Sequence, residues 1–405
     1  MAINQQKTQL AHRSVVLVAS ATALSLLGDQ ALYAVLPTCY QKLGLMSIQV
    51  GILLSANRWI RMLTNHLAER LIHRVNPTAL LVSAMVLGAG VTGIYGLFPG
   101  FPVLLAARML WGLCWSVIRQ VGIMTSVDVS PQAYAARTMG FYSSLSRVGS
   151  ILGMLAGAYL FDLLGSDLPG FKYTFWILAA AMLLAVVPGA TARKSLDQRH
   201  SEFRRPRGAN ETNRIRALLV CAFVIGCVGP GVIESTLGYA LKRKLGDSVS
   251  IAQIIIGIAT LNAVILSFRH AINLLGAPLL GHLADRIGHQ KGVFIFFCIT
   301  TVILAAAAVA SSVWMLICLV LLFFICATCL GVVLATEAGG SGSRAFAWYA
   351  TAADFGAATG PLLAWTALQF YGLPWVSFAI GAGFYVIGAV AAASRLRRPK
   401  ATPTG

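Results

Sequence analysis

Nine charged residues stand inside long apolar runs of the chain, where an ionised side chain is hard to accommodate. They are six arginines and three acids: Arg58, Arg61, Arg108, Arg119, Arg147, Arg269, Asp29, Glu234 and Asp354. Placing such a charge in a membrane costs about 2.5–3.5 kcal/mol, so each is a candidate for a functional role. The excess of arginine favours an anionic ligand, because a guanidinium group can bind carboxylate or phosphate through two parallel hydrogen bonds.

The most specific prediction from the sequence concerns Asp29 and Arg108. Each lies about seven residues from the outer end of its predicted helix, and equal depth on neighbouring helices predicts an ion pair. The proton affinity of such a carboxylate depends on its desolvation and on its distance from the arginine, so protonation can follow the conformation. The alternative is a static pair that only holds two helices together.

Polar side chains in the same runs are candidates for contacts with a solute, and helix packing is the competing role for each uncharged one. The binding residues that we expect are Arg58, Arg147, Asn57, Asn273, Gln30 and Tyr33.

The elements that carry these residues must be membrane-spanning helices. Of the 405 residues, 58% are hydrophobic and only 11% are charged, with a mean hydropathy of +0.77; a soluble domain has roughly 25% charged residues. Crossing the hydrocarbon takes about 20 mostly apolar residues in a helix. Twelve runs suit this, at about 14–36, 47–66, 78–98, 101–124, 138–161, 173–192, 216–238, 251–280, 291–311, 312–336, 345–369 and 371–394.

The chain divides into two similar halves. Residues 193–216 carry eight Lys/Arg and few apolar residues, which indicates a linker in water. NHLAER at 65–70 matches GHLADR at 281–286, and Arg147 and Asp354 occupy equivalent positions. Such symmetry is typical of transporters built from two repeats, with the binding site between them near the midplane.

We therefore predict an all-α integral membrane protein of twelve transmembrane helices in two pseudo-symmetric six-helix bundles. The bundles span residues 1–192 and 216–405, and a basic cytoplasmic linker, 193–215, joins them.

The basic residues predict the orientation. With both termini and the linker in the cytoplasm, the inside segments hold 20 Lys/Arg and the outside segments five. The net charge of +18 does not indicate nucleic-acid binding, because these residues lie mainly between apolar runs. No cleaved signal is expected, since no small-residue cleavage site follows the first run. The eight cysteines lie almost all in apolar runs and are expected to pack there, so we expect no disulfide, metal or cofactor.

One segment resembles the cytoplasmic loop motif of the major facilitator superfamily. In GHLADRIGHQK at 281–291, Gly281 permits close helix approach, and Asp285 and Arg286 can pair with groups across the loop. The copy in the first half, NHLAERLIHR at 65–74, has Glu69 in place of the aspartate and lacks the glycines.

A second resemblance lies at 107–131. ARMLWGLCWS, followed by VDVSP, is similar to the family's fourth-helix pattern around an intramembrane arginine, here Arg108. On the fifth predicted helix, GSILGMLAG (149–157) has Met154 where family antiporters usually have proline. Its glycines at four-residue spacing suit close helix packing.

The resemblance implies roles for several residues. A carboxylate on helix 1 that faces the fourth-helix arginine is a common proton-coupling arrangement, which would give that role to Asp29 and Arg108. Helix 11 would meet helix 2, so Asp354 would pair with Arg58 or Arg61 as a gate. Helix 5 would meet helix 8, bringing Arg147 to Asn273 or Arg269. The gating residues implied are Arg61, Asp354, Glu69, Asp285, Arg286 and Gly281. A monomer is the family expectation.

These observations predict a secondary transporter in the cytoplasmic (inner) membrane. It would move a small, anionic organic solute by alternating access, coupled to protons, with export as one of two open directions. A multidrug efflux proton antiporter is the alternative within the class; acids in the cavity would favour it, and arginine dominates here. A non-transporting membrane sensor or scaffold is the alternative of another class. An enzyme is not expected, because the sequence contains no metal-spaced His/Cys cluster, nucleophile elbow or phosphate-binding glycine loop.

Overall fold

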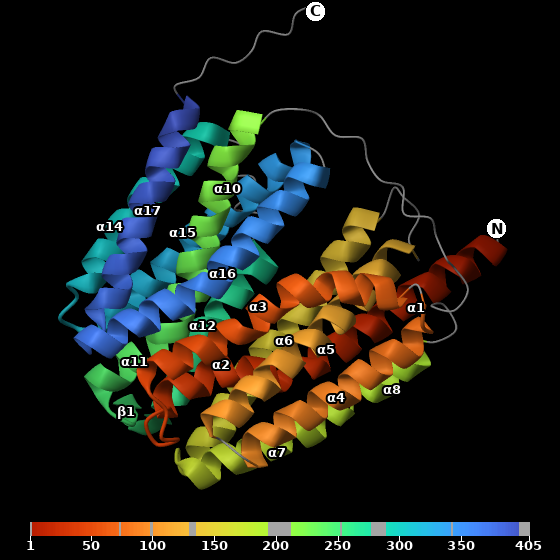
Figure 1. The fold of residues 1–405 in the computed structure, drawn as a ribbon, viewed down its shortest axis with the longest axis horizontal. Helices are drawn as coiled ribbons and strands as arrows, with labels where there is room; N and C mark the ends of the chain where they lie inside the picture. Colours follow the sequence, from red (N-terminus) through yellow and green to blue (C-terminus); the bar gives the residue numbers. More distant parts are fainter. Residues whose placement is uncertain are drawn as a thin grey trace, which may run out of the picture. The chain divides into compact units, whose positions relative to one another are not determined.

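The structure is a computed structural model that describes residues 2–72, 74–97, 100–128, 135–192, 212–251, 253–276, 289–341 and 343–396. Nearly all of them are helical (Figure 1). Ten of the described helices are long and apolar enough to cross a membrane. α3 (Ser47–Ile72) and α16 (Ser343–Tyr371) are also long enough, but their charged and small polar residues make them less apolar. The predicted all-helical membrane fold of twelve spans is confirmed.

The chain forms two compact units. Unit 1 comprises residues 1–203 together with 245–270. Its elements are α1 (Ala2–Ser25), α2 (Leu27–Cys39), α3, α4 (Pro77–Leu97), α5 (Phe101–Asp128), α6 (Ala135–Leu163), α7 (Leu168–Leu183), α8 (Val186–Thr191), the strands β1 (Ser248–Ile251) and β2 (Ile254–Gly257), and α12 (Ile258–Ala271), which ends at the boundary. Within it, α3 packs on α5, α2 on α6, and α4 on both α5 and α7.

Unit 2 comprises residues 204–244 and 271–405. Its elements are α10 (Thr212–Gly226), the π-helical segment η2 (Cys227–Ile233), α11 (Glu234–Leu245), a second π-helical segment η3 (Ile272–Gly276), α14 (His289–Ala308), α15 (Val313–Gly340), α16 and α17 (Trp375–Leu396). α14 packs on α15 and α17, while α10 and η2 pack on α16.

Close backbone contacts hold α6 against the first span. α1 and α2 form one span, Arg13–Cys39, which is interrupted at Leu26. Each glycine of the predicted stripe on α6 faces this span so closely that a Cβ atom would meet Ala23, Leu27 or Ala31; the three are Gly149, Gly153 and Gly157. The predicted close packing of this stripe is confirmed, and it fixes α2 beside α6.

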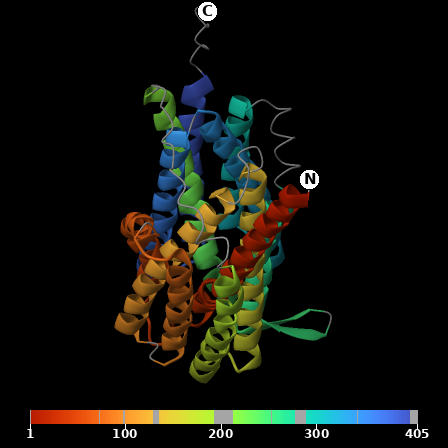
Figure 2. The same cartoon turned by 90° about the vertical axis from the view of Figure 1, so that its right-hand side faces the viewer.

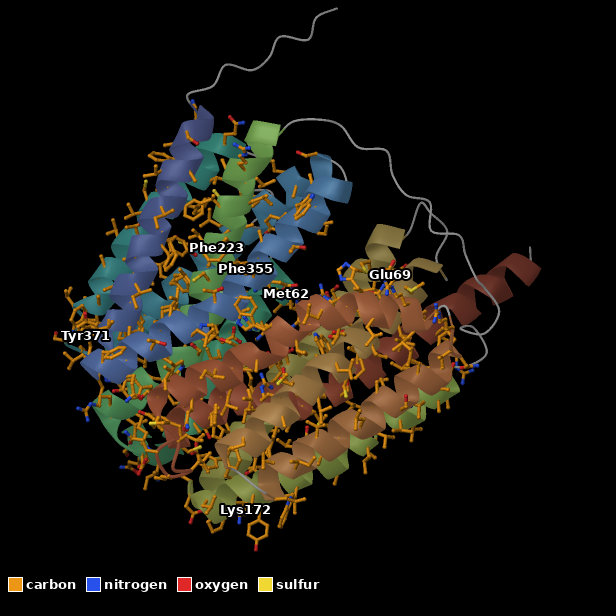
Figure 3. The ribbon with its side chains drawn as sticks, viewed as in Figure 1. Met62, Glu69, Lys172, Phe223, Phe355 and Tyr371 are labelled. Carbon is orange, nitrogen blue, oxygen red and sulfur yellow. The ribbon has the colours of Figure 1, made fainter. Side chains whose placement is uncertain are left out.

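Unit 2 uses the same device between α10–η2 and α16. A Cβ atom on Gly226 would meet the backbone of Ala353, and one on Gly356 would meet the backbone of Phe223. The rings of Phe223 and Phe355 pack beside these contacts with their centroids 5.7 Å apart (Figure 3). Pro230 lies within η2, where the α-helical hydrogen-bond pattern is interrupted.

The apolar run at 251–280 was expected to be one helix, and this is wrong for its first part. β1 and β2 form an antiparallel hairpin in which Ser248 pairs with Gly257 and Ile251 with Ile254, and α12 begins only at Ile258. The hairpin projects from unit 1 (Figure 2). A short isoleucine-rich run suits a strand as well as a buried helix, so hydrophobicity alone could not separate them.

Candidate functional site

An interruption in the first span positions Asp29. The helix breaks at Leu26, α2 starts at Leu27, and Asp29 lies in its first turn, where the positive end of the helix dipole favours a carboxylate. The residue is only 6% exposed. Arg108 projects from α5 and is completely buried. Two opposite charges are thus enclosed together inside unit 1.

Arg108 is held from three directions. Its Nη1 forms the ion pair with Asp29 Oδ1 that equal depth predicted. Its Nε donates to the carbonyl of Leu53 on α3 at 3.1 Å, and its Nη2 donates to the hydroxyl of Tyr33 at 3.3 Å. A buried ion pair is stable only when its remaining hydrogen-bonding groups also find partners, and these contacts supply them.

Tyr33, Asn57 and Gln30 complete the network. The Tyr33 hydroxyl lies 3.2 Å from the carbonyl oxygen of Leu54 and 3.4 Å from Asn57 Oδ1, both of which can accept its proton. Asn57 Nδ2 donates to Asp29 Oδ1 at 3.4 Å, and Gln30 Nε2 donates to Asp29 Oδ2 at 3.0 Å. These three side chains, predicted as solute contacts, bond to the ion pair or to each other in this structure. We call Asp29, Arg108, Tyr33, Asn57 and Gln30 the ion-pair network.

Arg58 borders this network. Its guanidinium carbon lies 5.5 Å from the centre of the Tyr33 ring, and that of Arg108 lies 5.4 Å from the same centre. Both distances suit cation–π attraction. Unlike Arg108, Arg58 is only half-buried, so this second positive charge beside Tyr33 is partly exposed.

The sequence as a whole matches a known family. The family model described as Major Facilitator Superfamily matches residues 18–268, more than half of the chain. The chain belongs to the major facilitator superfamily. It is 25% identical over 316 residues to the multidrug resistance protein MdtG of Klebsiella pneumoniae (strain 342), a match that covers 73% of this chain and 71% of that protein.

Solved structures of superfamily transporters share the fold of this one. A bacterial homologue of the human lysosomal transporter Spinster, described as inward-facing and occupied, aligns with a TM-score of 0.79 at 15% identity, over 96% of this chain and 98% of that one. The nucleoside transporter NupG aligns with a TM-score of 0.74 at 12% identity, over 96% and 100%. Membership makes this chain a multi-pass secondary transporter of a small-molecule substrate, not an enzyme.

Two arginines and a histidine form a second group elsewhere in unit 1 of the transporter. Arg147 on α6 and Arg269 on α12 are close enough for their like charges to interact, and His270 experiences both. All three side chains are partly buried. The expectation that Arg147 faces Asn273 or Arg269 stays a prediction. We call these three residues the arginine cluster.

The predicted gating residues are spread over both units or lie outside the described residues. Arg61 is half-buried on α3, and Glu69 is exposed on the same helix, at the end of unit 1 opposite Lys172 (Figure 3). Asp354 lies on α16 in unit 2. Its pairing with Arg58 or Arg61 of unit 1 therefore stays a prediction.

Asn273, predicted to meet Arg147, lies on η3 in unit 2, so that contact also stays a prediction. Gly281, Asp285 and Arg286 lie outside the described residues.

Two further acids, Glu234 and Asp162, lie in environments that sequence analysis did not predict. Glu234, one of the three acids in the apolar runs, is only 4% exposed. Asp162, which was not singled out, accepts hydrogen bonds from Thr260 on α12 and from Ser166. The signal for Glu234 was its position directly after the Cys227–Ile233 segment, which contains Pro230. Asp162 follows an apolar run and resembles an ordinary loop residue.

Proposed function

We propose that the protein is a proton-coupled transporter of a small organic anion that works by alternating access. The observation that carries the proposal is the ion-pair network of unit 1. The carboxylate of Asp29 is paired with the guanidinium group of Arg108, and both side chains are buried. Protonating Asp29 removes the charge that holds Arg108, so a proton on this residue and the geometry of the network depend on each other.

Protonation of Asp29 changes the charge of the network but leaves part of its hydrogen bonding in place. When Asp29 is protonated, Arg108 keeps the carbonyl of Leu53 and the hydroxyl of Tyr33 as acceptors. When Asp29 is neutral, the guanidinium group of Arg108 can bind another anion. If the site opens to one side of the membrane at a time, the proton enters from one side and leaves to the other.

The arginine cluster supports an anionic substrate. Arg147 and Arg269 repel each other, and six arginines stand against three acids in the spans. An anion between the two guanidinium groups would replace this repulsion by attraction, and arginine binds carboxylate or phosphate through paired hydrogen bonds. A monocarboxylate, a dicarboxylate or a phosphate ester would all satisfy this chemistry.

Multidrug efflux is the second candidate, because the relative from Klebsiella pneumoniae is named a multidrug resistance protein. That name favours outward transport. At 25% identity the substrate class does not follow from the relationship, and the arginine excess argues for an anion over a cation.

The orientation and assembly are also proposals. The basic bias of the loops supports cytoplasmic termini, which makes the Lys172 end of unit 1 the outer end. The bacterial relative supports the inner membrane as the location. We propose a monomer as the transporting form, made of the 1–192 and 216–405 bundles with the 193–215 linker between them.

The test is flux in proteoliposomes with an imposed pH gradient. Lactate, succinate and glycerol phosphate serve as anionic probes, tetraphenylphosphonium and ethidium as cationic probes, and an enclosed pH dye reports proton movement. We expect anion flux with proton movement in the natural protein. Asp29→Asn should abolish the gradient dependence, because the amide keeps the shape of the carboxylate but carries no charge.

Glu234→Gln is the matched control, since it neutralises the buried acid in the first turn of α11. It should keep the gradient dependence. Unchanged gradient dependence in Asp29→Asn would remove this residue from coupling. Flux of the cations alone would favour multidrug efflux, and flux of no probe would favour a non-transporting role.

A further inference from the structure

The start of α12 is fastened to unit 1 by a carboxylate from another helix. Asp162, near the end of α6, accepts hydrogen bonds at Oδ2 from the backbone nitrogen of Thr260 (2.7 Å) and from its hydroxyl (2.6 Å). Thr260 is in the first turn of α12. The first turn of a helix has backbone N–H groups with no partner inside the helix, and a carboxylate is a strong acceptor for them.

The surroundings fit this contact closely. The Ser166 hydroxyl donates to Asp162 Oδ1 at 3.0 Å, so both carboxylate oxygens are engaged. Gly257, at the end of β2, faces the carboxylate so closely that any Cβ atom would collide with it. The chain thus enters α12 at the one kind of residue that leaves room for Asp162.

Two further contacts join the same segment to unit 1. Asn262, fully buried on α12, donates to the carbonyl of Ala34 on α2 at 2.9 Å. Lys42 bridges Asp247, beside the hairpin, at 3.2 Å and the carbonyl of Ser166 at 3.0 Å. The Lys42 pair is exposed, so it contributes little compared with the enclosed contacts.

The Asn262 bond leaves one group unsatisfied. Its side-chain oxygen is buried and has no hydrogen-bond partner among the described residues. A buried acceptor without a partner raises the free energy of this conformation. It therefore reduces the stability of this conformation relative to one in which α12 has moved. Half-satisfied contacts of this kind suit a junction that forms and breaks.

The chain passes from unit 2 into unit 1 and back again at residues 245–270. Residues 245–270 belong to unit 1 by their contacts, yet the residues on both sides of them, up to Lys244 and from Ala271, belong to unit 2. A movement of one unit against the other must therefore either carry this segment along with unit 1 or pull α12 away from α6.

We propose that Asp162 is a latch residue: its bonds to Thr260 hold α12 on α6 at the Lys172 end, and they break when the transporter opens at that end. The inference rests on the alternating access proposed above. It assigns a positioning role to Asp162, which sets the balance between two conformations and does not touch the solute.

The experiment uses pulsed electron paramagnetic resonance to measure the separation of two spin labels, one on each unit, in segments that the predicted topology assigns to the same side of the membrane as Lys172. The labels replace Tyr173 on α7 and Val309 after α14, both exposed, in a chain whose eight native cysteines are substituted. Asp162→Ala should raise the ratio of long to short separations on the order of ten-fold, the size expected from losing a hydrogen bond to a charged group. Asp162→Asn should restore most of the original ratio, because its oxygen can still accept the backbone N–H of Thr260.

Asp167→Ala is the matched control. Asp167 also caps a helix, accepting from Gly170 N at 2.8 Å, but that helix is α7, which follows it directly. Its loss should leave the ratio unchanged. Thr260→Val removes only the hydroxyl bond and should shift the ratio in the same direction by less, which keeps the test available if Asp162→Ala does not fold.

An unchanged ratio in both Asp162→Ala and Thr260→Val would overturn the latch, as would an equal shift in Asp167→Ala. If the natural protein shows two separations that respond to a transported probe while the Asp162 variants shift neither, only the latch is wrong. If no variant or probe ever yields a second separation, alternating access and the latch are both wrong.

Discussion

A buried acid lies at a corresponding place in each half of the transporter, but the neighbouring helices of the two halves differ. Asp29 lies just after the interruption of the first span, and Glu234 lies just after the π-helical segment that interrupts the first span of the second half. Asp29 has Arg108 on the fourth helix of its half. The fourth helix of the second half, α15, contains no arginine or lysine.

The interiors around these acids differ accordingly. In unit 1, Arg108 donates to the carbonyl of Leu53 and to the hydroxyl of Tyr33, and Asp29 accepts from Asn57. In unit 2, glycines on both α10–η2 and α16 bring the backbones together. Close packing through glycines is thus common to both units. Unit 1 adds to it the enclosed Asp29–Arg108 pair, whose arginine has no counterpart on α15.

The largest expected effect is that of Arg108→Ala. It leaves the Asp29 carboxylate buried without its counter-ion, which should lower the free energy of unfolding by about 3–5 kcal/mol. Denaturant unfolding of the purified protein in detergent measures this. Arg58→Ala is the control, and it should cost clearly less because Arg58 is half-buried. Equal losses in the two variants would mean that the enclosed ion pair contributes no more to the free energy of unfolding than the half-buried Arg58.

In unit 2 the corresponding test is Gly356→Ala. The new Cβ atom would meet the backbone of Phe223, which cannot move aside as a flexible side chain can, so a loss of about 1–3 kcal/mol is expected. Gly229→Ala is the matched control, because a Cβ atom on Gly229 meets nothing within 4 Å. The same unfolding assay compares them. If both substitutions were neutral, the close approach of α16 to α10 would not contribute to the stability of unit 2.

Tyr33→Phe is expected to have a smaller effect. It removes the hydroxyl that accepts from Arg108 and can donate to Leu54, while the ring stays beside Arg58. We expect a loss of about 1 kcal/mol. Tyr239→Phe in unit 2, which removes the bond to the Gly372 carbonyl at 2.9 Å, provides the comparison. A larger loss for Tyr239→Phe would contradict the view that polar bonds matter more in unit 1.

The smallest effect is expected for Lys42→Ala. The Lys42–Asp247 pair is solvent-exposed, with side chains 34% and 58% accessible, and such pairs contribute about 0–1 kcal/mol. The melting temperature should hardly change and should depend little on salt. A loss comparable to that of Arg108→Ala would show that exposed and buried pairs of unit 1 do not differ as described.

The sequence predicted the parts of this structure that depend on local chemistry. Twelve apolar runs give the fold because a bilayer requires helices of that length. The Asp29–Arg108 contact could be predicted because depth along a helix follows from counting residues at a fixed rise.

The missed features depend on tertiary contact. The strand β2 was predicted as part of a helix because isoleucine suits both structures. Only the pairing of β2 with β1 selects the strand. Asp162 was missed because its partner, Thr260, is 98 residues away and neither residue has an unusual local sequence. Tyr33 and Asn57 were found, but counting could not tell that they would bond to the ion pair.

The hairpin formed by β1 and β2 has a practical consequence. Ile254 and Ile255 are 65% and 78% exposed, and Gln253 has a positive φ of 69° in the turn. The contacts of Asp247, Gly257 and Thr260 with unit 1 are all at its base. A short epitope inserted at the turn should therefore leave folding intact, and antibody binding to whole cells would then report directly which side of the membrane this end faces.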